Sequence, residues 1–135
     1  MSQIESLISL GDANVQNLIG LCKTGFSSQT FDEVADDLML ADLRLARLIH
    51  IPKSTLTRRK REGRFSFEES ERLFRIARLF SIAKNVLGTK EFAREWLHTP
   101  SRDFEGKTPL EFSDTEIGAR EVEAVLGRIA DGVIF

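Results

Sequence analysis

The chain has 135 residues, of which 41% are hydrophobic and 30% are charged, so it has enough apolar residues to bury a core and is not typical of a disordered protein. No apolar run approaches the roughly 20 residues that span a bilayer, and the stretch from Met1 to Glu5 lacks the cationic and apolar blocks of a signal peptide. The single cysteine, Cys22, excludes an internal disulfide, so we expect a cytoplasmic protein. From the absence of a long apolar run we also expect no contact with a membrane.

The formal net charge of −2 conceals an uneven distribution of charge along the chain. Before Leu43 the only cation is Lys23, and acids again outnumber bases from Glu105 onward. Between these regions lies a cluster of cations interrupted by one acid, Glu62. The cluster consists of Lys53, Arg58, Arg59, Lys60, Arg61 and Arg64. A local cationic patch of this kind favours contact with nucleic acid even when the whole chain is nearly neutral.

In chain order, apolar residues at helical spacing predict a short helix within 2–12 and a second one that ends at Gly25. A third helix should begin at Ser27 and Ser28. Asp42 is expected to cap a fourth. His50 and His98 are the only histidines, and neither has an acidic residue or a cysteine at metal-ligand spacing. The sequence also contains no glycine-rich phosphate loop. We therefore expect neither an enzyme nor a cofactor.

The segment 46–61 has the pattern of a helix-turn-helix. Ala46 is the small residue needed where the helices cross, His50 stands at the turn position that requires a positive φ, and Leu56 is the inward anchor of the second helix. The predicted DNA-binding residues are Lys53, Ser54, Thr55, Thr57, Arg58, Arg59, Lys60, Arg61 and Arg64. The alternative interpretation is a solvated basic face on an ordinary helical bundle.

A capping box at Ser66 and Glu69 opens the longest predicted helix, which extends to about Leu87. Its two apolar stripes indicate a central helix that joins two lobes, with a homodimer contact as a further expectation. Arg72, Arg75 and Arg78 lie on its polar side, where pairing with neighbouring glutamates is favoured over phosphate contact.

The second half continues with helices only. Thr89 should cap a helix that places Trp96 in the core, and Thr108, Pro109 and Glu111 form a well-defined helix start. A last helix is predicted from Asp114 to about Ala130. No strand-like alternation is present, so the predicted fold class is all-α.

These motifs together resemble the MbcA/ParS/Xre antitoxins over roughly residues 26–135. The resemblance rests on the segments 54–59, 63–70, 93–97, 106–110, 115–120 and 122–133, which follow one another in the expected order. It implies an N-terminal helix-turn-helix lobe joined by a long central helix to a small helical toxin-binding lobe. The implied divisions are a variable segment 1–25, a DNA-binding domain 26–65, a connecting helix 66–87 and a toxin-binding domain 88–135.

The resemblance further implies an antitoxin of a type II toxin–antitoxin system, with a RES-domain toxin that consumes NAD as its partner. Such a protein binds its own promoter as a homodimer, forms a hetero-oligomer with the toxin and blocks the toxin's active-site cleft. The implied toxin-binding residues are Lys107, Arg128, Gly132, Val133, Ile134 and Phe135. The alternative is a stand-alone helix-turn-helix regulator whose C-terminal lobe dimerises or senses a ligand.

Overall fold

A computed structural model describes residues 15–132, and within them the regular structure is helical apart from one isolated β-bridge between Ser27 and Arg64. The predicted all-α class is therefore confirmed. The helix expected within 2–12 and the residues Val133, Ile134 and Phe135 lie outside the described range. The chain divides into two compact units, residues 1–77 and 78–135, and the long helix α6 (Phe67–Leu87) contributes residues to both.

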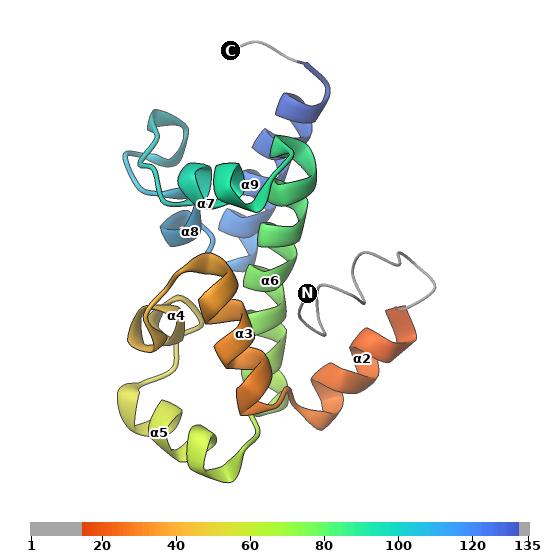
Figure 1. Cartoon of the computed structure of the whole chain (residues 1–135), viewed down its shortest axis with the longest axis vertical. Coiled ribbons are helices and arrows are strands. Elements are labelled where there is room, and N and C mark those ends of the chain that lie inside the picture. Colours follow the sequence, from red (N-terminus) through yellow and green to blue (C-terminus); the bar gives the residue numbers. More distant parts are fainter. Residues whose placement is uncertain (1–14, 133–135) are drawn as a thin grey trace. The chain divides into compact units, whose positions relative to one another are not determined.

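In the described part of the first unit, residues 15–77, four helices precede the beginning of α6 (Figure 1). They are α2 (Val15–Thr24), α3 (Ser28–Leu38), α4 (Asp42–Leu48) and α5 (Lys53–Glu62). Phe31 of α3 is fully buried and stacks on Phe65, with ring centroids 5.2 Å apart. Leu73 and Ile76 of α6 are equally buried, so the expected inward stripe of that helix forms part of this core.

The turn between α4 and α5 has the predicted geometry. His50 adopts a φ of 58°, Ala46 and Leu56 are buried, and the N–H of Ile51 donates to the carbonyl of Ala46 at 2.8 Å. Arg72 does not pair with neighbouring glutamates as expected. Its guanidinium donates instead to the carbonyl of Ile49 at 2.7 Å, so α6 satisfies a backbone acceptor at the end of α4.

The start of α4 also differs from the prediction. Ala41, not Asp42, is the N-cap residue, and no side chain caps this helix. Asp42 occupies the first helical position, and its carboxylate is hydrogen-bonded to Lys60 of α5. The prediction that Asp42 caps α4 was wrong because its carboxylate accepts a hydrogen bond from Lys60, 18 residues away.

The second unit contains the rest of α6 and three further α-helices (Figure 1). They are α7 (Lys90–Leu97), α8 (Pro109–Phe112) and α9 (Glu116–Ala130), with a short 3₁₀ turn at Arg102–Phe104 between α7 and α8. Thr89 caps α7 and Thr108 forms the predicted capping box with Glu111. The last helix begins two residues later than predicted, because Thr115 is its N-cap.

The short helix α8 and the start of α9 approach each other closely at Gly118. Its N–H donates to the Thr115 hydroxyl at 3.0 Å, and a Cβ atom added to it would lie only 1.8 Å from the carbonyl oxygen of Phe112. Only glycine fits this contact. None of the helices that the structure describes is both long and apolar enough to cross a bilayer.

Candidate functional site

The outer surface of α5 carries most of the residues predicted to bind DNA. Lys53, Ser54, Thr57, Arg58 and Arg61 are exposed, and Thr55 is half-buried. The guanidinium of Arg58 lies 3.6 Å from Glu62, four residues along the same helix, in a pair whose two side chains are both about half exposed. Such a surface pair contributes little stability, so Arg58 can leave it for another anion.

Arg59 has a partner within the first unit. Its Nε atom donates to Oε1 of Glu69 at 2.7 Å and a terminal nitrogen donates to Oε2 at 3.2 Å, which makes the contact bidentate. The hydrogen bond to Glu69 raises the pKa of Arg59. Burial alone would raise the pKa of Glu69, yet the hydrogen bonds from Arg59 and Ser66 outweigh burial and lower that pKa below its ordinary value.

Lys60 also has partners within the first unit. Its Nζ atom donates to Asp32 of α3 at 3.0 Å and to Asp42 of α4, and it lies 5.5 Å from the centre of the Phe31 ring. Burial opposes the charged form of Lys60, but the hydrogen bonds to Asp42 and Asp32 outweigh burial and raise its pKa. Lys60 therefore connects α5 to both α3 and α4.

Arg64 is exposed along its side chain, but its guanidinium donates to the carbonyl of Gly25 at 2.7 Å. The cationic run thus contains two kinds of side chain, those directed outward and those engaged by Glu69, Asp32, Asp42 and Gly25. These acceptors were not predicted from the sequence, in which the only signal for them was the near absence of cations before Leu43, where Asp32 and Asp42 lie.

The residues implied in toxin binding lie in or beyond the second unit. Lys107 is exposed in the loop before α8, and Arg128 of α9 is exposed with its guanidinium 4.0 Å from Glu121. Gly132 follows α9 with a φ of 74°, the left-handed conformation that commonly ends a helix. Val133, Ile134 and Phe135 lie outside the described residues.

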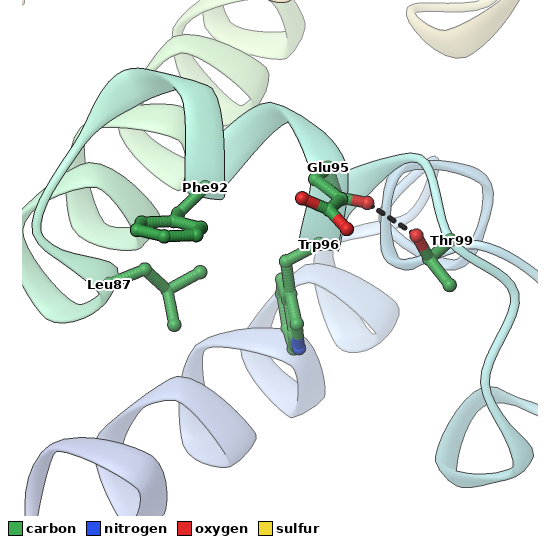
Figure 2. A pocket seen from close by; sticks show the side chains of 5 residues that line it. All are labelled: Leu87, Phe92, Glu95, Trp96 and Thr99. Atoms are coloured by element: carbon green, nitrogen blue, oxygen red, sulfur yellow. Dashed lines mark hydrogen bonds between the residues drawn. The ribbon is translucent and has the colours of Figure 1, made fainter.

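An open pocket of about 530 Å³ lies between the end of α6 and α7 in the second unit (Figure 2). Leu87, Phe92 and Trp96 provide its apolar walls, and the Thr99 hydroxyl donates to the Glu95 carbonyl at its edge. Trp96 was expected in the core but is only half-buried, because its side chain lines this open pocket. Its ring is nearly perpendicular to that of Phe104, with the ring centroids 6.0 Å apart.

The described residues hold no group of three or more histidine, cysteine or acidic side chains with the geometry of a metal site. Cys22 is buried, and burial, assisted by the carboxylate of Glu71, raises the pKa of its thiol. A thiol in this state is a poor nucleophile at neutral pH.

Two protein families match this chain in succession. Residues 18–78 match the antitoxin Xre-like helix-turn-helix domain, and residues 83–132 match the antitoxin Xre/MbcA/ParS C-terminal toxin-binding domain. A protein named Antitoxin Xre from Yersinia enterocolitica is 35% identical over 118 residues, which cover 86% of this chain and 80% of the relative. Proteins of the same name from Pseudomonas putida and Photorhabdus laumondii are 39% and 35% identical, and the matched segments cover 52% and 50% of their lengths.

Proposed function

Because this chain belongs to the Xre/MbcA/ParS family of antitoxins, whose members are not enzymes, we propose that it neutralises a RES-domain toxin that consumes NAD and represses the operon encoding both proteins. The matches to a helix-turn-helix domain and to a toxin-binding domain support this division of roles. We assign DNA binding to residues 26–65, toxin binding to residues 88–135 and the connection to residues 66–87.

The observation that carries the DNA-binding assignment is the exposed cationic and hydroxyl-bearing face of α5. Lys53, Ser54, Thr55, Thr57 and Arg58 lie on its first two turns, where a recognition helix contacts base edges, and Arg61 follows at the phosphate-contacting end. A single recognition helix contacts too few base pairs for operator affinity. We therefore propose a two-fold homodimer on an inverted repeat.

Fluorescence anisotropy tests this assignment with the duplex upstream of the gene and a scrambled duplex of equal length. Arg58→Ala should weaken binding to the upstream duplex by about 1–3 kcal/mol more than binding to the scrambled one, because a base contact carries sequence information. Arg61→Ala should weaken both equally, because a phosphate contact does not. Arg120→Ala is the matched control, an exposed arginine of α9 that pairs with Glu116. Equal affinity of the unaltered protein for both duplexes would refute the proposal.

For the toxin, we propose steric inhibition in which the residues from Gly132 to Phe135 obstruct substrate entry while Lys107 and Arg128 contact the toxin surface. The match of residues 83–132 to a toxin-binding domain supports a toxin contact made by this part of the chain. The exposure of Lys107 and Arg128 also supports it, because both cations lie at the surface, where charges guide association with a partner.

An assay of NAD consumption by the product of the neighbouring gene tests the toxin assignment. Deletion of residues 132–135 should restore NAD consumption while the two proteins still co-elute in size-exclusion chromatography. Arg61→Ala, which alters an exposed residue of the DNA-binding domain, serves as the control and should inhibit fully. Complete inhibition by the truncated chain would refute the obstruction mechanism, and a neighbouring product that leaves NAD intact would refute the RES assignment.

A further inference from the structure

The helix that we assign to DNA recognition has very little apolar anchoring. Leu56 is the one buried side chain of α5, and every other residue of this helix is exposed or half-buried. One apolar contact fixes the position of a helix but leaves its rotation and tilt poorly determined. Base recognition requires side chains held within about 0.5 Å and 10–20° of the productive geometry. Polar contacts must therefore determine how α5 is oriented.

Lys60 makes such contacts on one side of the helix. Its ammonium group reaches Asp32 of α3 at 3.0 Å and also Asp42 of α4, so one side chain connects three helices of the first unit. The same group lies over the ring of Phe31, which is fully buried and stacked on Phe65. The ammonium group therefore packs against a buried ring that is itself held by packing. We infer that the position of this group determines the rotation of α5 about its axis.

Arg59, the preceding residue, makes a contact with a different helix. Its guanidinium binds both carboxylate oxygens of Glu69 on α6, and the N–H of Ser66 donates to the same carboxylate at 2.8 Å. Consecutive residues of a helix point about 100° apart. The two cations therefore hold α5 from two directions, toward α6 and toward α3 and α4.

We propose that Lys60 is a positioning residue for DNA recognition, which orients α5 through Asp32 and Asp42 and does not contact phosphate. This inference rests on the proposed DNA-binding function. A phosphate contact would require the ammonium group to leave two carboxylates, and those carboxylates would then repel the phosphate. Arg61, the next residue, is exposed, whereas Lys60 is bound by Asp32 and Asp42, so Arg61 provides the matched comparison.

The salt dependence of binding distinguishes the two roles. Each phosphate contact adds about 0.9 to the slope of log affinity against log salt concentration. Lys60→Met keeps an unbranched side chain of similar length but removes the charge. It should weaken binding to the upstream duplex by about tenfold, the effect of one disturbed base contact, and leave the slope unchanged. Arg61→Met should lower the slope by about 0.9 for each bound copy of the chain, or about 1.8 for the proposed homodimer. A slope for Lys60→Met that falls as much as that of Arg61→Met would overturn the inference.

A charge exchange provides the second test. Lys60→Glu alone should abolish specific binding, whereas Lys60→Glu combined with Asp42→Lys again places one cation between two carboxylates. The double variant should recover affinity to within about threefold of the unaltered protein, because the ion pair between positions 42 and 60 is restored with its polarity reversed and the new cation at position 42 offsets the charge of Asp32. An anion at position 60 cannot bind phosphate, so recovery is incompatible with a phosphate contact.

Circular dichroism at the assay temperature confirms that each variant is folded before binding is measured. A folded double variant without recovered affinity would refute the positioning role. Failure of the unaltered protein to bind either duplex would refute the DNA-binding function itself, and with it this inference. Normal binding by the unaltered protein together with a lowered slope for Lys60→Met would refute the positioning role alone.

Discussion

Gly118 gives the sharpest test of how the second unit is built. Alanine at this position would place a Cβ atom 1.8 Å from the backbone oxygen of Phe112 and 3.1 Å from the Thr115 hydroxyl. A backbone carbonyl cannot move aside as a flexible side chain can. Gly118→Ala must therefore displace the first turn of α9 from α8 and weaken the cap that Thr115 provides.

The expected change in the free energy of unfolding of Gly118→Ala combines two costs and one gain. Overpacking costs about 1–3 kcal/mol, and a weakened N-cap costs about 1 kcal/mol. The greater helix propensity of alanine returns about 1 kcal/mol. The net expected loss in the free energy of unfolding is about 1–3 kcal/mol. Gly127→Ala is the matched control on the same helix, because a Cβ atom there would meet nothing within 4 Å. It should stabilise the unit by up to about 1 kcal/mol.

Urea unfolding followed by tryptophan fluorescence measures both variants. Trp96 is the single tryptophan of the chain and lies in the second unit, so its emission reports the unfolding of that unit. A loss of about 2 kcal/mol would move the midpoint by about 1 M. Equal midpoints for Gly118→Ala and Gly127→Ala would refute the claim that close contact between α8 and α9 requires glycine.

Two further predictions concern polar contacts that each unit depends on. Glu69→Gln should lower the free energy of unfolding by about 1.5–3 kcal/mol in urea titrations followed by circular dichroism, because it removes the charged partner of Arg59. Since the pKa of Glu69 is lowered on folding, its contribution is present above the ordinary glutamate pKa and is lost as the pH falls through the lowered value. The variant should therefore lose less stability than the unaltered protein below about pH 4, and an equal loss would contradict this. Thr108→Ala should cost the second unit about 1 kcal/mol in the fluorescence titration, and no change would mean that the capping box contributes nothing.

Features determined by neighbouring residues were predictable from the sequence. The capping boxes at Ser66 and Thr108 lie where expected, because their donors and acceptors are three residues apart. The same holds for the turn at His50, whose positive φ follows from the spacing of the helices on either side. Local geometry therefore located the helices to within about two residues.

Contacts between distant residues were not predictable. Arg72 lies 23 residues from its acceptor, the carbonyl of Ile49, and no sequence pattern marks a backbone carbonyl as an available acceptor. Aspartate is a residue type that commonly caps helices. The carboxylate of Asp42 instead binds Lys60, because the packing of α3, α4 and α5 brings these two residues together. Trp96 was expected in the core because periodicity identifies the inward face of a helix but not an opening in that face.

The same limitation affects the count of cations available to DNA, and it leads to a last prediction. Six cations lie between residues 53 and 64, but the structure engages Arg59, Lys60 and Arg64 internally. The outward set is Lys53, Arg58 and Arg61. If all three contact phosphate in the non-specific complex, they contribute about 2.7 to the salt slope for each copy of the chain, whereas six cations would contribute about 5.4. Replacing Lys53, Arg58 and Arg61 by methionine should lower the salt slope of binding to a scrambled duplex by about 2.7 per bound copy. Almost no part of the remaining slope should then come from α5. A remaining contribution that disappears only when Arg59 and Lys60 are also replaced would mean that DNA draws these cations from Glu69, Asp32 and Asp42.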